Sequence, residues 1–241
     1  MTATDIADVL WTWTPYLAGG FAWNILLSIV TMAIGTPIGL LLAAMRASHR
    51  RSAARTGNLL TGVARNIPTF VMLFYLAYML PPEVTVLGQT LPVPAWVKAS
   101  LALAVAVAGF VSDNALPAIR HLRRHDTAAA LLFLPAWTNY FLIIVMASST
   151  ASVIGVPEIV QRANTVVGAV GDVDVMLWIY LYAMVWFFAV CWPLALTMQV
   201  VRRRLRHRAD ARWGGHRAAS GPVAAAPADA AVSGIPVGRV P

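Results

Sequence analysis

Long apolar runs separated by short arginine-rich blocks most strongly limit how this chain can fold. Five such runs lie at about residues 21–45, 59–80, 98–119, 128–155 and 175–201. Each is at least about the 20 residues that a helix needs to cross a bilayer. Only 12% of the residues are charged, about half the share usual in soluble domains. The sequence therefore predicts an all-α membrane protein with five transmembrane helices.

The basic residues predict the orientation of these helices. Blocks at 46–55 and 120–124 and the segment after residue 201 hold 15 of the 18 Lys and Arg residues. The opposite set of loops holds only Lys98 and Arg162. The positive-inside rule places the arginine-rich side in the cytoplasm. The N-terminus is then outside and the C-terminus cytoplasmic, which requires an odd number of crossings.

The chain divides into three predicted parts. Residues 1–20 form a periplasmic or interfacial N-terminal segment, 21–206 a five-helix transmembrane domain, and 207–241 a disordered cytoplasmic tail rich in Ala, Gly and Pro. Pro135 is expected to divide the fourth run into a short interfacial helix and the crossing itself. Residues 83–95 and 158–174 are expected to be loops. Gly35 and Gly39 predict either a close helix contact or a bend in the first crossing.

Hydroxyl side chains interrupt the fourth apolar run at Ser148, Ser149, Thr150 and Ser152. Polar groups in hydrocarbon cost free energy unless they hydrogen-bond or face water. One interpretation is that this helix lines a wet path for a solute. The other is that the hydroxyls bond back to their own helix or allow a neighbouring helix to pack closely. The residues alone leave both interpretations open.

Asp113 is the only acidic residue predicted inside an apolar run. An ionisable group within a membrane is a functional candidate by default. The alternative is a structural ion pair with Arg65 or Arg120, because Asp113 lies about two helical turns from the basic end of its run.

Several other functions are disfavoured. The single cysteine, Cys191, permits no disulfide within the chain. The five histidines lie in arginine-rich segments without the spacing of a metal site, and no phosphate-binding glycine loop is present. The basic blocks follow membrane topology, so nucleic acid is not an expected partner. The chain is thus predicted to be neither an enzyme nor a carrier of a metal or cofactor.

Residues 152–158 read Ser-Val-Ile-Gly-Val-Pro-Glu, and Asn139 precedes them in the same run. Arg65, Asn66, Ile67 and Pro68 stand near the start of the second run. With the Gly35 and Gly39 pair and Pro81, these segments resemble the membrane (permease) subunits of ABC-type importers for polar amino acids. The resemblance covers about residues 20–206 and is most specific at 152–158. It implies the fold of a type I importer permease.

The resemblance also implies a function and a set of partners. The chain would be a permease subunit in a bacterial cell (inner) membrane, translocating polar amino acids or similar zwitterions. An extracytoplasmic solute-binding protein would deliver the substrate, and a separate ATP-binding ABC subunit would hydrolyse ATP. A second permease subunit, identical or related, would complete the path within the membrane lipid. The candidate path residues are Asn139, Ser148, Ser149, Thr150, Ser152, Asn66 and Asp113.

The family also carries a cytoplasmic loop, of the EAA type, that docks on the ATPase subunit. The matching residues here are His121, Arg124, Asp126, Thr127, Ala128, Ala129 and Leu132. Thr127 or Ala128 stands in place of the family's Glu, and its Gly is absent. These departures motivate two alternatives: a diverged subunit of a heterodimeric permease with weak ATPase coupling, and a non-transporting membrane scaffold with a basic tail.

Overall fold

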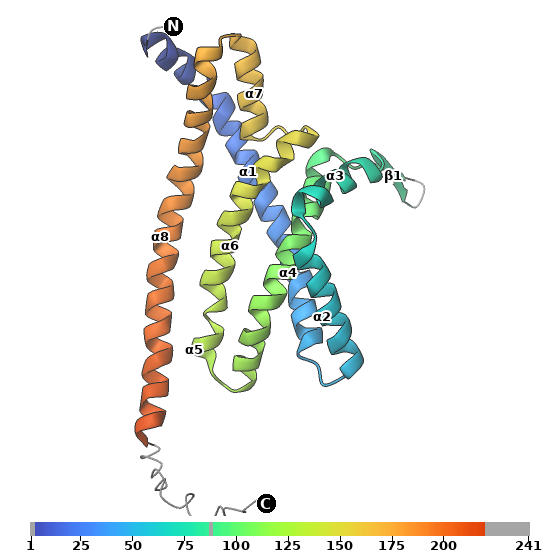
Figure 1. Cartoon of the computed structure of the whole chain (residues 1–241), viewed down its shortest axis with the longest axis vertical. Coiled ribbons are helices and arrows are strands. Elements are labelled where there is room, and N and C mark those ends of the chain that lie inside the picture. Colours follow the sequence, from blue (N-terminus) through green and yellow to red (C-terminus); the bar gives the residue numbers. More distant parts are fainter. Residues whose placement is uncertain (1–2, 87–88, 220–241) are drawn as a thin grey trace, which may run out of the picture.

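Helices make up almost the whole structure, a computed structural model that describes residues 3–86 and 89–219 (Figure 1). The long helices are α1 (Ala3–Arg46), α4 (Ala95–Arg123) and α8 (Val173–Ala219). A fourth is α6 (Phe133–Ala147), which continues into the 3-10 helix η1 (Ser148–Ile154). Each is long and apolar enough to cross a membrane. The prediction of a largely α-helical chain, with helices long and apolar enough to cross a membrane, is therefore confirmed.

The second apolar run is not the single straight helix that the sequence predicts. It consists of α2 (Arg51–Asn66) and α3 (Thr69–Met79), which meet at an angle of 92°. Pro68 lacks a backbone N–H, and the residue before a proline avoids the helical region. Ile67 and Pro68 accordingly adopt extended backbone. The described residues thus contain four candidate crossings, or five if the bent pair counts as one.

Both predicted loops contain regular structure. In the first, β1 (Glu83–Val86) and β2 (Gln89–Pro92) pair as antiparallel strands. The prediction of a loop at 158–174 is wrong, because this segment contains α7 (Ile159–Val170). The helix α7 ends at Gly171, which has a φ of 67°. Glycine adopts this left-handed conformation without steric cost.

The expected break at Pro135 lies a few residues earlier. The short helix α5 (Thr127–Ala130) ends before α6 begins at Phe133. Pro135 stands in the first turn of α6, where its missing N–H leaves no helical hydrogen bond unmade.

The two ends of the chain are more helical than the sequence suggests. α1 runs without a break from Ala3 through the predicted boundary at residue 20. α8 continues to Ala219, so residues 207–219 are helical where the sequence predicts disorder. Residues 220–241 lie outside the described residues, and disorder there stays a prediction.

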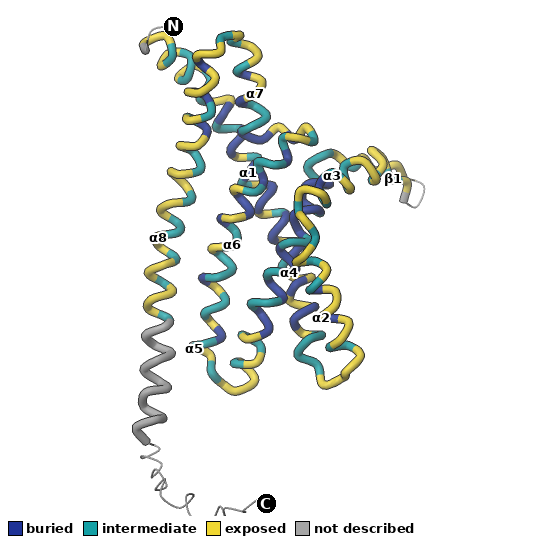
Figure 2. The backbone as a smooth tube through the Cα atoms, viewed as in Figure 1, coloured by how far each residue is buried: buried dark blue, intermediate teal, exposed yellow. Residues whose placement is uncertain are grey.

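Among the described residues, helices α1 and α4 make the most extensive contact, and the two glycines of the first run lie in it. A Cβ added to Gly35 or Gly39 would lie 2.6 Å from the Cβ atom of Val107 or Val111 respectively. Any larger residue would force the two helices apart, so these glycines serve close packing. Buried residues concentrate along α1 and α4, whereas much of α8 is exposed (Figure 2). Exposed apolar residues of α8 include Leu177, Met184, Phe188 and Trp192, which a bilayer would cover.

The basic blocks gather at one end of the molecule. The turn between α1 and α2, the turn between α4 and α5, and the later part of α8 lie at this end, which we call the basic end (Figure 1). The N-terminus and α7 lie at the opposite end. This arrangement agrees with the predicted grouping of the arginines, and the assignment of the basic end to the cytoplasm stays a prediction.

Candidate functional site

The four hydroxyls of η1 all donate to their own helix. Each bonds the carbonyl oxygen three residues earlier, over 2.7 Å for Ser148 and Ser149 and 2.8 Å for Thr150 and Ser152. This is the spacing of a 3-10 turn, so the helix satisfies these donors locally. Ser148 is buried, whereas Ser149, Thr150 and Ser152 are partly exposed. Their oxygens keep acceptor capacity for a solute.

A closed polar cluster, here called the Asn24 cluster, joins α1, η1 and the start of α7. It consists of Asn24, Ser148 and Glu158, all fully buried. Asn24 Nδ2 donates to Ser148 Oγ over 2.9 Å and to Glu158 Oε2 over 3.0 Å. Its Oδ1 accepts the backbone N–H of Ile159 over 3.1 Å. The sequence reasoning missed Asn24, although an amide inside the first apolar run was a usable signal.

Glu158 caps α7 as well as binding Asn24. Its carboxylate accepts the backbone N–H of Val160 over 3.0 Å and that of Gln161 over 2.9 Å. Burial raises the pKa of Glu158, and these hydrogen bonds oppose that rise only in part. Gly155, with a φ of 83°, makes the turn that brings Glu158 to the helix start. The Gly and Glu of the 152–158 segment therefore reverse the chain between η1 and α7.

A charged cluster, here called the Asp113 triad, ties α4 to the ends of α1 and α2. Asp113 Oδ1 accepts from Arg46 Nη1 over 2.8 Å, and Oδ2 accepts from Arg65 Nη1 over 3.2 Å. The side chains of Arg46, Asp113 and Arg65 are 15%, 29% and 66% exposed. The predicted pairing with Arg65 is confirmed, but the second partner is Arg46 and not Arg120. Arg46 also donates to Ser112 Oγ over 3.0 Å.

The triad borders a cavity of about 310 Å³ at the break between α2 and α3, here called the ion-pair cavity. Arg65 and Asp113 form its charged wall, and Asn114 adds an amide. The remaining lining residues are Ala64, Ile67, Thr69, Ala106, Phe110 and Tyr140.

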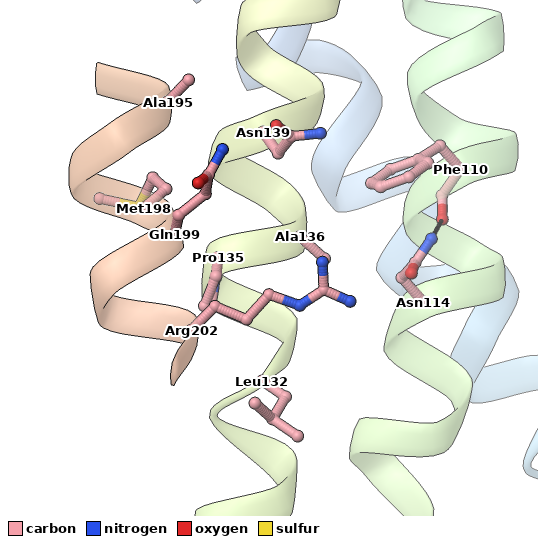
Figure 3. A pocket seen from close by; sticks show the side chains of 10 residues that line it. All are labelled: Phe110, Asn114, Leu132, Pro135, Ala136, Asn139, Ala195, Met198, Gln199 and Arg202. Atoms are coloured by element: carbon pink, nitrogen blue, oxygen red, sulfur yellow. Dashed lines mark hydrogen bonds between the residues drawn. The ribbon is translucent and has the colours of Figure 1, made fainter. Parts of the chain in front are cut away.

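A second cavity, of about 420 Å³, lies between α4, α6 and α8 and is here called the amide cavity (Figure 3). Asn114, Asn139 and Gln199 give it three amide groups, and Arg202 gives it a guanidinium. Apolar residues complete the wall: Phe110, Leu132, Pro135, Ala136, Ala195 and Met198.

Phe110 and Asn114 line both cavities. The Phe110 ring stacks on Tyr140, with centroids 3.7 Å apart and planes 4° apart. The two cavities therefore meet around one aromatic pair.

The structure separates the predicted path residues into three groups. Asp113 borders the ion-pair cavity and Asn139 the amide cavity. The hydroxyls of η1 lie at the other end of the α6–η1 helix from these cavities (Figure 1). Asn66 lines neither cavity; its Nδ2 donates to the Gly62 carbonyl of its own helix over 2.8 Å.

The predicted coupling loop forms a compact turn at the basic end. Asp126 Oδ2 lies 3.4 Å from His121 Nδ1, and Asp126 Oδ1 accepts the backbone N–H of Ala129 over 3.2 Å as the cap of α5. Arg124 and Thr127 are exposed. Ala128 lies within α5, and Leu132 lines the amide cavity. Docking of this loop on an ATPase stays a prediction.

Comparisons with known proteins find relatives but no matching family model. The chain is 25% identical over 213 residues to the probable amino-acid ABC transporter permease protein YckA of Bacillus subtilis (strain 168). That match covers 80% of this chain and 90% of YckA. The chain is also 26% identical over 211 residues to the L-cystine transport system permease protein TcyB of the same organism. This second match covers 79% of this chain and 87% of TcyB.

A solved structure shares the fold. It is described as the crystal structure of an amino acid ABC transporter with histidines. The superposition has a TM-score of 0.70 at 20% sequence identity, covering 85% of this chain and all of the matched chain. At that identity the likeness supports the fold alone. The chain thus shares the fold of an amino acid ABC transporter, and over about four fifths of its length it is similar in sequence to two amino-acid transport permeases.

Proposed function

We propose that the chain is the permease subunit of an ATP-driven importer that translocates polar amino acids or similar zwitterions. An extracytoplasmic binding protein delivers the substrate, and a separate ABC subunit hydrolyses ATP. The chain lies in a bacterial inner membrane with its basic end in the cytoplasm, and a second permease subunit completes the path. The family supports these roles, and one relative is named for L-cystine.

The observation that carries this proposal is the depth and openness of the Asp113 triad. Asp113 lies seven residues before Arg120, the first arginine of the basic block on α4, or about 10 Å along the helix. That is about a third of the thickness of a hydrocarbon core of about 30 Å. A charged group at such depth is costly unless it is paired or faces water. The exposed guanidinium of Arg65 therefore favours a wet path at the ion-pair cavity.

The triad offers the chemistry that a zwitterion needs. A guanidinium has five N–H donors, and Asp113 is the one protein partner of the Arg65 side chain among the described residues. The remaining donors can take a substrate carboxylate in a bidentate pair. Asp113 and the amide oxygen of Asn114 can accept from the substrate ammonium. Arg46 holds the Asp113 carboxylate in place.

Polar groups on either side of the Asp113 triad would form the rest of the path. Asn139 would border this path on the other side of the Phe110 ring, at the edge of the amide cavity. Ser149, Thr150 and Ser152 would offer acceptor oxygens nearer the opposite end. The loop from His121 to Leu132 would transmit closure of the ATPase subunits to α4 and α6, which it joins.

The test is uptake of labelled amino acids into proteoliposomes that contain the chain, its ATPase and a loaded binding protein. If the wild-type chain neither binds the ATPase nor shows stimulated ATP hydrolysis, the importer proposal fails. Stimulation that requires a second, different permease chain would indicate the heterodimeric alternative. Assembly without transport would indicate a scaffold.

Arg65→Gln tests the site itself. Loss of a charge-assisted hydrogen bond of about 1.5–3 kcal/mol should lower uptake by about tenfold or more. The matched control is Arg55→Gln, an exposed arginine on the same helix, which should leave uptake unchanged. Equal uptake by both variants would contradict a role for Arg65 in binding the substrate.

A further inference from the structure

Among the described residues, the guanidinium that projects into the amide cavity has no acidic partner. Arg202 extends from α8 across the cavity towards α6, beside Ala136 (Figure 3). Among the described residues, no hydrogen bond or ion pair is found for its side chain. It differs in this respect from Arg46 and Arg65, which both bind Asp113.

The residues around this guanidinium are suited to an anion. The ten lining residues include no Asp or Glu, so Arg202 leaves the cavity positively charged. Asn139 and Gln199 add amide N–H groups that can donate to anionic oxygens. A volume of about 420 Å³ falls within the range of about 300–1,000 Å³ typical of small-molecule sites. The cavity can therefore hold a phosphate group with several donors around it.

The position of the cavity favours a lipid as the source of that phosphate. Arg202 opens the basic block that follows the apolar part of α8, and it is exposed, as are Arg203 and Arg204 beside it. Such a block marks the level of anionic headgroups in a membrane. Deeper in the cavity, Ala195 and Met198 give an apolar wall. Between residues 173 and 200, α8 exposes many apolar side chains that lipid would cover (Figure 2).

We propose that the amide cavity binds the phosphate of an anionic phospholipid on Arg202, Asn139 and Gln199. The glycerol and the start of the acyl chains lie against Ala195 and Met198. The bound headgroup joins α8 to α6 at the basic end. Leu132, the last residue of the predicted coupling loop, lines the same cavity. Occupancy by lipid therefore supports the position of that loop.

Native mass spectrometry of the purified full chain, reconstituted with phosphatidylglycerol or phosphatidylcholine, tests this site. The wild-type chain should retain phosphatidylglycerol in preference to phosphatidylcholine. Arg202→Gln should lower that retention by about tenfold, as expected for loss of a charge-assisted contact of about 1.4 kcal/mol. Arg202→Lys should restore part of it. Arg204→Gln is the matched control because it removes an exposed charge, outside the cavity, from the same helix.

Three outcomes would overturn the proposal. Equal retention of the two lipids would show that the site does not recognise anionic headgroups. Equal losses in Arg202→Gln and Arg204→Gln would show general attraction to the basic block. Displacement of the lipid by millimolar inorganic phosphate, or by an amino acid, would assign the cavity to a soluble anion instead. Gln199→Leu, which keeps all arginines, checks the site independently and should lower retention less than Arg202→Gln.

Discussion

The Asn24 cluster and the Asp113 triad both place polar groups inside the helix bundle, but they differ in how completely they are enclosed. Asn24, Ser148 and Glu158 are fully buried, and their bonds join three segments of the chain. The triad opens onto a cavity, and its Arg65 side chain is 66% exposed. The Asn24 cluster is enclosed by protein, whereas the Asp113 triad keeps hydrogen-bond donors on Arg65 that a ligand could bind.

This difference separates stability from function. A satisfied buried network fixes the geometry of the segments it joins, and removal of one member leaves the others unpaired. A cluster with spare donors can bind a ligand, and its exposed member contributes little to stability. We therefore expect substitutions in the Asn24 cluster to affect unfolding and substitutions at Arg65 to affect uptake.

The largest effect is expected for Asn24→Leu. This change leaves the buried N–H of Ile159 without its partner and removes one of the three hydrogen bonds to the buried Glu158 carboxylate. The free energy of unfolding should fall by about 3 kcal/mol, as for other broken buried polar networks. Denaturant titration in detergent measures it. Asn66→Leu is the control because Asn66 is exposed and, within the described part of the chain, its side chain bonds only its own helix. Similar losses of unfolding free energy in both variants would show that the buried Asn24 cluster stabilises the fold no more than the exposed Asn66 bond does.

The next effect distinguishes the two arginines of the triad. Arg46 is mostly buried and binds Ser112 as well as Asp113. Arg46→Gln should therefore lower the free energy of unfolding by about 1–2 kcal/mol. Arg65→Gln should lower it by less than about 0.5 kcal/mol, because exposed ion pairs contribute little. The same titration measures both. A larger loss of unfolding free energy in Arg65→Gln than in Arg46→Gln would mean that the exposed Asp113–Arg65 ion pair stabilises the fold.

The stability that the Asn24 cluster contributes should depend on pH through Glu158. Burial raises the pKa of Glu158, so this carboxyl holds its proton more tightly in the folded state than in the unfolded state. Its contribution to stability is full below the unfolded pKa and is lost as pH rises through the raised folded pKa. The wild-type advantage over Glu158→Gln should be greatest at acidic pH and shrink as pH rises. Thermal unfolding across a pH series measures this advantage, with Glu83→Gln on the exposed hairpin controlling for net charge. A constant advantage would contradict the assignment.

The sequence predicted the parts of the fold that follow from periodicity and local sterics. Long apolar runs gave the long helices, and Gly35 and Gly39 gave a close contact because no other residue fits against α4. The break at Pro68 was also readable, since proline and its predecessor both disfavour a helix. It was missed because apolar length alone was used to define the second crossing.

The parts that the sequence did not predict depend on which segments meet in space. Asn24 and Glu158 are 134 positions apart, and nothing local indicates that they bond. Arg46 was assigned to orientation, although the end of α1 brings it to Asp113. The helix α7 was read as a loop because its start is set by the Glu158 cap and not by a long apolar run.

The smallest effect concerns two neighbouring hydroxyls that the sequence could not tell apart. Ser148 and Ser149 both donate to their own helix, but only Ser148 also accepts from Asn24. Ser148→Ala should cost about 1 kcal/mol of unfolding free energy, and Ser149→Ala less than about 0.5 kcal/mol. If the oxygen of Ser149 serves the substrate path, Ser149→Ala should instead lower uptake at unchanged stability. Unchanged uptake would assign this hydroxyl to its helix alone and leave Asp113 and Asn139 as the polar groups of the path.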